Sequence, residues 1–131
     1  MVKKILFLCD RNTVRSPMAA SLLKDADSAG ISADPYVGFA CAVMLEDGID
    51  ITGHEPRTVN PKELKPDMTV IALSAPAFES ARKWREKAGF ELEYWDLPAV
   101  PEHGSRETLL AGFRSIRDAI KGHIRNRFAK P

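Results

Sequence analysis

Cys9 and Arg15 lie near the start of the chain, on either side of a short polar loop. Cys9 ends the apolar run of residues 5–9, and Ser16 and Pro17 follow Arg15. A loop between a strand and the start of a helix collects backbone N–H groups and the positive end of the helix dipole, which together suit an oxyanion. The same position favours a thiolate nucleophile, and an arginine can hold two oxygens of a phosphate-like dianion. The spacing predicts that one loop contains a nucleophile, backbone N–H groups that bind an anion, and an arginine that binds the same anion.

Strand and helix patterns alternate along the whole chain. We expect strands at residues 3–8, 28–31, 68–73 and 92–95, and helices at residues 16–24, 36–47, 76–88 and 106–128, with a short helical turn after residue 60. In the first helix, Ser16 suits the N-cap and Pro17 the first helical position. In the last helix, the apolar stripe is expected to comprise Leu109, Phe113, Ile116, Ile120 and Ile124.

This alternation predicts the α/β class. We expect a three-layer, doubly wound sheet of about four parallel strands with helices on both faces. Residues 1–131 are expected to form a single domain. In such sheets ligands bind beyond the carboxyl ends of the strands. Cys9, Ser74 and Asp96 each follow a predicted strand, so we expect them at that edge.

Charge and cysteine content narrow the possible partners. The 19 basic and 18 acidic residues give a net charge of +1, which predicts neither a nucleic-acid partner nor an anionic membrane surface. The apolar runs are too short to span a bilayer. Two cysteines, Cys9 and Cys41, are too few for a disulfide framework or a four-cysteine zinc site. So few cysteines favour a location in a reducing cytoplasm.

The loop resembles that of the low-molecular-weight protein tyrosine phosphatase family, which includes a branch of arsenate reductases. The family loop reads Cys-x-Gly-Asn-x-Cys-Arg-Ser-Pro, and residues 9–17 match its cysteine, asparagine, arginine, serine and proline. The resemblance continues in residues 28–30, 48–57 and 70–74 and in the last helix. It covers nearly the whole chain and implies a low-molecular-weight phosphatase-like fold.

The resemblance implies a role for each residue of the loop. Cys9 would attack phosphorus and form a cysteinyl-phosphate, and Arg15 would bind the equatorial oxygens. The Ser16 hydroxyl would hydrogen-bond the thiolate, and Asn12 would brace the loop. Backbone N–H groups would stabilise the transition state. The implied phosphate-binding residues are Arg11, Asn12, Thr13, Val14, Arg15 and Ser16. No metal or other cofactor is implied, because arginine and the loop amides carry the charge that Mg²⁺ carries elsewhere.

Three departures from the family pattern lie in and after the loop. Arg11 stands in place of a glycine and adds a cation beside the anion site. Val14 replaces the second cysteine, so a disulfide with Cys9 is impossible within the loop. The interval from Ser16 to Ser28 is also shorter than usual, which indicates a trimmed first helix or a degenerate second strand.

A fourth departure concerns the general acid. Alignment puts Ala99 where the family has the aspartate of an Asp-Pro pair, and the aromatic residues that usually follow are absent. Asp96, Glu102 and His103 are candidates to replace it, and we select Asp96 because it lies at a strand end. A general acid typically contributes about 10²–10⁴-fold, so its loss predicts impaired catalysis.

Several of these residues also have purely structural explanations. Cys9 could be a buried structural cysteine, and Asp96 a turn-forming or capping residue. A plain surface role fits Arg15 poorly, because a cation at a helix N-terminus opposes the dipole. His54 is expected to brace a loop rather than to catalyse, and Cys41 is expected to lie in the core.

Three functions remain open at this point. The first is a cysteine-dependent phosphatase acting on a phosphorylated protein or a small phosphoester, with phosphotyrosine or an aryl phosphate as the substrate. The second is an arsenate reductase that uses an external thiol, because only Cys41 could relay a disulfide within the chain. The third is a catalytically weak pseudophosphatase that binds phosphate, arsenate or a protein partner. The physiological substrate and the oligomeric state remain open.

Overall fold

Four parallel strands form one sheet in the order β2-β1-β3-β4. The computed structural model describes residues 4–33 and 38–128. The strands are β1 (Lys4–Cys9), β2 (Asp27–Gly30), β3 (Met68–Ala72) and β4 (Glu91–Tyr94). The strand directions and their alternation with helices confirm the predicted α/β class.

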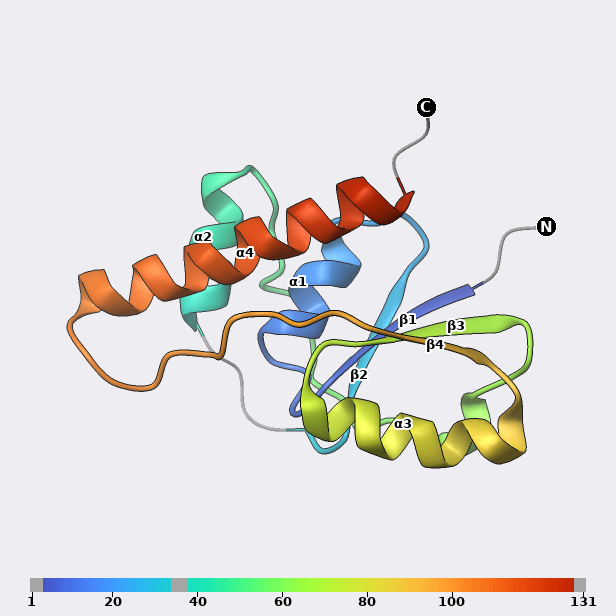
Figure 1. Ribbon diagram of the computed structural model, residues 1–131. Helices are drawn as coiled ribbons and strands as arrows, with labels where there is room; N and C mark the ends of the chain where they lie inside the picture. Colours follow the sequence, from blue (N-terminus) through green and yellow to red (C-terminus); the bar gives the residue numbers. More distant parts are fainter. Residues whose placement is uncertain (1–3, 34–37, 129–131) are drawn as a thin grey trace.

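Helices cover both faces of the sheet (Figure 1). The elements are α1 (Arg15–Ser21), α2 (Gly38–Glu46), the 3-10 turn η1 (Pro61–Glu63), α3 (Ala75–Ala88) and α4 (Arg106–Phe128). α1, α2 and α4 lie on one face, above the sheet in Figure 1, and α3 lies on the other. The sheet is therefore the middle of three layers, as predicted.

β1 contributes to the cores on both faces, because successive side chains of a strand point to opposite sides. Phe7 and Cys9 join the core beneath α1, α2 and α4. Leu6 and Leu8 join the second core, which lies beneath α3. All four side chains are buried. Cys9 therefore ends its strand on the face that α1 covers.

The predicted N-cap at Ser16 is wrong. α1 begins at Arg15 with Val14 at the N-cap, and no side chain caps the helix. Ser16 is buried, and its hydroxyl oxygen lies 2.9 Å from the Cys9 sulfur. The Ser16 hydroxyl therefore contacts the Cys9 thiol, although local propensity predicts that it caps the first turn of the helix.

Smaller differences concern the limits of the other helices. α1 ends at Ser21, three residues before the predicted end at Lys24. The predicted start of α2 at residue 36 lies outside the described residues. In α4, Leu110 fills the core position assigned to Leu109, which lines a cavity instead. The predicted turn after residue 60 is confirmed as η1.

Ion pairs on the surface join the end of α2 to α4. The Glu46 carboxylate accepts hydrogen bonds from Arg114 at 2.7 Å and from Arg117 at 2.8 Å. Lys121 donates to Asp47 at 2.9 Å. The hydrogen bonds from Arg114 and then Arg117 lower the pKa of Glu46 from 4.5 to about 2. Ionised Glu46 is therefore stabilised in the folded chain.

We expect Glu46→Gln to destabilise the fold at neutral pH and to have progressively less effect in acid. The folded-state pKa is depressed, so the stabilisation is present above about pH 4.5 and is lost as the pH falls toward about 2. Urea midpoints of wild type and variant should differ at pH 7 and converge as the pH falls from about 4.5 to about 2. Glu79→Gln, which removes a carboxylate paired within α3, is the control and should change the midpoint less. Identical midpoints for wild type and Glu46→Gln at pH 7 would contradict the prediction.

Candidate active site

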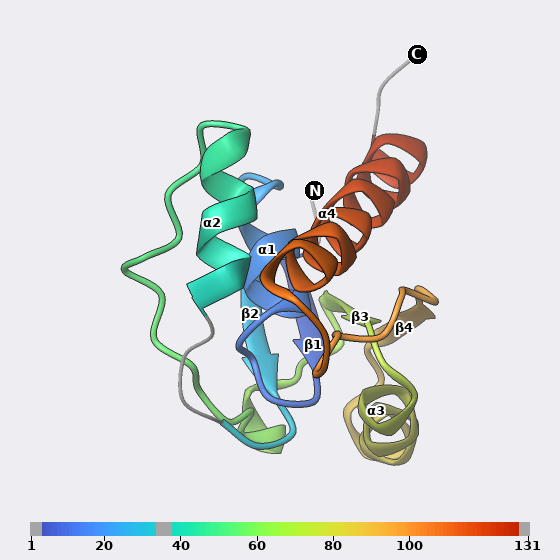
Figure 2. The ribbon, with the colours of Figure 1, turned by 90° about the vertical axis from the view of Figure 1, so that its left-hand side faces the viewer.

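The loop between β1 and α1 lies at the carboxyl edge of the sheet, beside the segment that joins β4 to α4. Figure 2 views the molecule from this edge. The two segments, together with α2 and α4, enclose a cavity of about 550 Å³. Its loop residues are Cys9, Asp10, Arg11, Thr13, Val14 and Arg15. Its other lining residues are Phe39, Ala99, Val100, Pro101, Glu102, Leu109 and Phe113.

The Cys9 thiol lies at the base of the loop and has two polar contacts. Cys9 is 3% exposed, and its sulfur accepts a hydrogen bond from the Asn12 N–H at 3.3 Å. The Ser16 hydroxyl oxygen lies 2.9 Å from the same sulfur. Both groups can donate to a thiolate, which stabilises the charged form of a cysteine. The arrangement therefore suits a nucleophilic sulfur that opens onto the cavity.

Asn12 braces the loop through hydrogen bonds to the segments packed against it. Its φ of 58° lies in the left-handed region, which asparagine adopts more readily than most residues. Its side-chain N–H₂ donates to Ser16 at 2.8 Å and to Ser28 at 3.0 Å. Its side-chain oxygen accepts from the Arg57 N–H at 2.9 Å, and His54 Nε2 lies 2.8 Å from its carbonyl oxygen. Asn12 and His54 both make the bracing contacts that the sequence predicts.

Gly30 allows β2 to approach the loop closely. A Cβ atom at this position would lie 2.7 Å from the Asn12 nitrogen and 2.8 Å from the Arg11 carbonyl carbon. The chain after Gly30 also binds the loop, because the Ile31 N–H donates to the Cys9 carbonyl at 3.0 Å. The backbone of the loop is therefore packed directly against the backbone that follows β2.

Asp10 brings a carboxylate into the cavity beside Arg15. Arg15 Nη2 lies 3.8 Å from Asp10 Oδ2, and the Ser74 hydroxyl donates to Asp10 Oδ1. Ser74 is also the N-cap of α3, where it accepts from the Ala77 N–H at 3.3 Å. Asp10 was not among the residues predicted for the site, although a charged residue directly after the cysteine is visible in the sequence.

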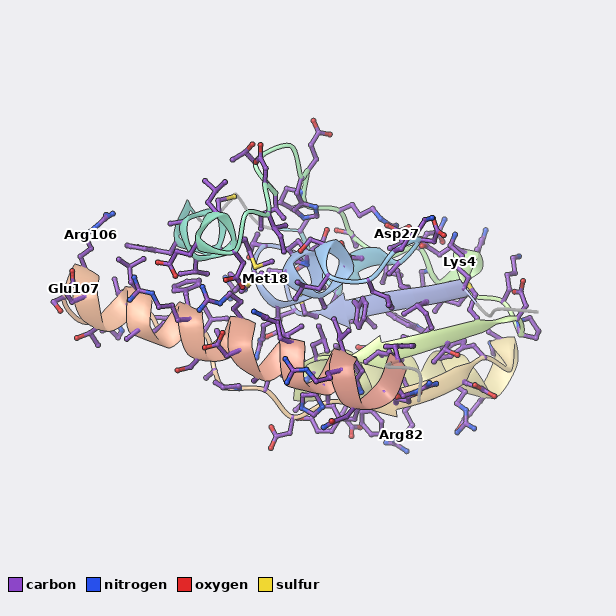
Figure 3. The ribbon with its side chains drawn as sticks, turned by 90° about the horizontal axis from the view of Figure 1, so that it is seen from above. Lys4, Met18, Asp27, Arg82, Arg106 and Glu107 are labelled. Atoms are coloured by element: carbon purple, nitrogen blue, oxygen red, sulfur yellow. The ribbon has the colours of Figure 1, made fainter. Side chains whose placement is uncertain are left out.

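Apolar side chains form the wall that faces the loop. Phe39 of α2 stacks on Phe113 of α4 with their ring centroids 5.6 Å apart. The guanidinium carbon of Arg106 lies 5.9 Å from the centroid of the Phe39 ring. Figure 3 shows Arg106 at the end of the molecule opposite Lys4 and Asp27, at which β1 and β2 begin. Nothing in the local sequence identified this aromatic pair, because it forms between helices distant in the chain.

The model of one protein family matches residues 4–130, and its description is Low molecular weight phosphotyrosine protein phosphatase. The chain belongs to this family. The arsenate reductase of Bacillus licheniformis is 33% identical over 135 residues, covering 98% of this chain and 96% of its own. A Ralstonia solanacearum protein named "Probable low molecular weight protein-tyrosine-phosphatase EpsP" is 32% identical over 112 residues, covering 74% and 77%.

The fold agrees with that of solved members and relatives of this phosphatase family. The structure of an arsenate reductase in its phosphate binding state matches with a TM-score of 0.67 and 27% identity, covering 95% of each chain. Membership therefore rests on the family match along nearly the whole chain, and the structural match supports the fold independently.

Glu102 is the candidate acid that lines the cavity in the described part of this phosphatase-family chain. Asp96, which we selected from the sequence, is exposed and lies outside the lining, as does His103. Trp95 and Leu97 are both buried in the core, so Asp96 between them faces solvent. Asp96 follows β4 at the carboxyl edge of the sheet, but it does not line the cavity that contains the thiol.

The segment that carries Glu102 packs closely against α4. A Cβ atom at Gly112 would lie 2.7 Å from Cγ of Pro101, so the absence of a side chain there permits this contact. Ala99, which the sequence predicts to stand at the position of the family's acid, lies in the same lining. The segment therefore borders the cavity and carries a carboxylate, that of Glu102, three residues after Ala99.

Among the residues that the structure describes, the charged side chains that line the cavity are Asp10, Arg11, Arg15 and Glu102. Across residues 4–33 and 38–128, no three His, Cys, Asp or Glu side chains are grouped so that they could hold a metal ion. In that same part of the chain, no helix has the length and hydropathy needed to cross a membrane. The candidate site therefore consists of the residues that line the cavity and the backbone of the loop.

Proposed function

We propose that this chain is a phosphatase that hydrolyses phosphoric monoesters through a cysteinyl-phosphate at Cys9. The observation that carries the proposal is the buried sulfur, which contacts the Asn12 N–H and the Ser16 hydroxyl and shares its cavity with Arg15. A thiolate in this position can attack phosphorus while the arginine and the loop amides bind the other phosphoryl oxygens. Family membership and the Ralstonia solanacearum relative support the proposal.

The reaction would proceed in two displacements. In the first, the Cys9 sulfur bonds to phosphorus while the bond to the leaving-group oxygen breaks, and that oxygen takes a proton. In the second, a water oxygen bonds to phosphorus and its proton passes to the group that protonated the leaving oxygen, while the sulfur–phosphorus bond breaks and phosphate leaves. Ser16 would stabilise the thiolate that departs, because its hydroxyl lies 2.9 Å from the sulfur.

The substrate class follows from the two sides of the cavity. The loop would bind the phosphoryl group, and the wall of Phe39, Val100 and Leu109 would contact an apolar or aromatic group attached to it. A phosphorylated protein side chain or a small aryl phosphate has this combination. The loop would likewise accept oxyanions such as phosphate or arsenate.

We assign the proton transfer to Glu102 and expect Glu102→Gln to slow the hydrolysis of phenyl phosphate by about 10²-fold. Phenolate is a poor leaving group, whereas nitrophenolate departs without a proton, so para-nitrophenyl phosphate should be affected much less. The measurement is kcat/KM for both substrates. Asp96→Asn is the matched control and should leave both values close to wild type. A loss confined to Asp96→Asn would return the role to Asp96, as the sequence predicted.

Arsenate reduction is a second candidate, supported by the 33% identity to the Bacillus licheniformis arsenate reductase along nearly the whole chain. Val14 replaces the loop cysteine, and Cys41 is buried on α2, so an external thiol would supply the electrons. The Cys9 sulfur would bond to arsenic as water leaves. A thiol such as glutathione would then attack that sulfur, giving a mixed disulfide and arsenite, and a second thiol would release Cys9. A reducing cytoplasm, the location predicted from the sequence, contains such thiols.

One set of assays on the wild-type chain distinguishes these functions. We expect multiple turnovers of phosphate release from para-nitrophenyl phosphate, and a phosphoryl group on Cys9 when the reaction is quenched in acid and analysed by mass spectrometry. Arsenite formed from arsenate and glutathione, without phosphate release, would replace the phosphatase with the reductase. Binding of phosphate without either turnover would make the chain a pseudophosphatase.

A further inference from the structure

Asp10 places a negative charge at the position where an anionic ligand would bind. It follows Cys9 directly, and both residues line the cavity with Arg15. The Asp10 side chain is 38% exposed, whereas that of Arg15 is 14% exposed. The guanidinium is therefore the more enclosed member of the pair.

The carboxylate is held from outside the loop. Ser74 is 6% exposed and follows β3, and its hydroxyl donates to Asp10 Oδ1 while accepting from the Ala77 N–H. A hydroxyl has one donor and two acceptor sites, so both contacts can exist together. The first turn of α3 therefore fixes the hydroxyl, and the hydroxyl fixes the side chain of Asp10 within the cavity.

The contact between Asp10 and Arg15 is loose enough to be exchanged. Its 3.8 Å separation exceeds the 2.7–2.9 Å of a charge-assisted hydrogen bond. By contrast, Arg57 binds both oxygens of Glu63 at 2.9 Å and 3.0 Å. Arg15 is therefore attracted to the carboxylate but is not locked onto it, and its donors remain able to turn to another anion.

We propose that Asp10 is a specificity-determining residue that competes with bound oxyanions for Arg15. An oxyanion that binds the guanidinium competes with the carboxylate, which stays in the same cavity and repels it. The repulsion grows with the charge of the ligand, so Asp10 weakens the binding of dianions more than the binding of monoanions. The inference rests on the oxyanion binding of the proposed function and does not depend on turnover.

The test measures binding of two inorganic probes by calorimetry at one pH and one ionic strength. Sulfate carries two charges near neutral pH, and methanesulfonate carries one. We expect Asp10→Asn, which retains an oxygen for Ser74, to bind sulfate about tenfold more tightly than wild type. The gain for methanesulfonate should be smaller. Asp10→Ala gives a second neutral variant with the same expected direction.

Asp96→Asn is the control for net charge, because it removes one aspartate at the same edge of the sheet but outside the cavity. An equal gain in sulfate affinity in this control would overturn the proposal. Unchanged or weaker binding by both Asp10 variants would also overturn it and would indicate that Asp10 positions Arg15 instead. The same holds if no variant binds either anion. Because the readout is binding, a phosphatase assay that fails would reject the proposed turnover and leave this inference to be decided by calorimetry.

Discussion

Cys9→Ser is expected to abolish turnover of phosphoric monoesters while the chain still folds and binds phosphate. A serine hydroxyl is not ionised at neutral pH, and the Asn12 N–H and Ser16 hydroxyl that contact the Cys9 sulfur are not bases that could activate it. We therefore expect a loss in kcat of at least about 10⁴-fold. Arg15 and the loop amides remain, so the phosphoryl oxygens keep their partners. The measurements are kcat with para-nitrophenyl phosphate and phosphate affinity by calorimetry.

Cys41→Ser is the matched control for this substitution. Cys41 is also a buried cysteine, but it lies on α2 and is not part of the cavity lining. It should lower the stability of the fold, because it buries a hydroxyl, and leave kcat within about twofold of wild type. Turnover that survives in Cys9→Ser would reject the proposed mechanism. Loss of turnover in both variants would show that the effect comes from folding rather than from the nucleophile.

Gly30→Ala has the second largest expected effect, because it moves the backbone of the loop. The added Cβ would lie 2.7 Å from the Asn12 nitrogen and 2.7 Å from the Ser32 carbonyl oxygen, and neither is a side-chain atom that could rotate away. The Asn12 N–H donates to the Cys9 sulfur, so any shift alters the contacts of the thiol. We expect a stability loss of about 1–3 kcal/mol, typical of overpacking, together with the loss of most phosphate binding.

Gly122→Ala provides the control for the loss of a glycine. Gly122 lies in α4, and a Cβ there would meet no atom within 4 Å. Alanine is a better helix former than glycine by up to about 1 kcal/mol, so this variant should be at least as stable as wild type and equally active. Both variants are compared by urea unfolding and by calorimetry with phosphate. Wild-type phosphate affinity in Gly30→Ala would show that the loop does not depend on this close packing.

Local patterns in the sequence were sufficient to predict the architecture. The buried apolar runs and the helical stripe of α4 depend on periodicity within one element, and both are found where they were expected except that Leu110 replaces Leu109 in the stripe. The loop of Cys9 and Arg15 could be recognised for the same reason, because its members are neighbours in the chain. Local propensity was misleading at Ser16, whose hydroxyl contacts the thiol instead of capping α1.

The fold class, the family resemblance and a loop with a cysteine and an arginine as a candidate anion site could therefore all be predicted from the sequence. The folded chain was needed to show which carboxylates share the cavity with them. Asp10 meets Ser74 across 64 positions of the chain, and Glu102 lines the cavity while Asp96 does not. These contacts depend on how the strands pair and on which neighbouring side chains are buried. Propensity and spacing within a short segment carry no information about strand pairing or about which neighbouring side chains are buried.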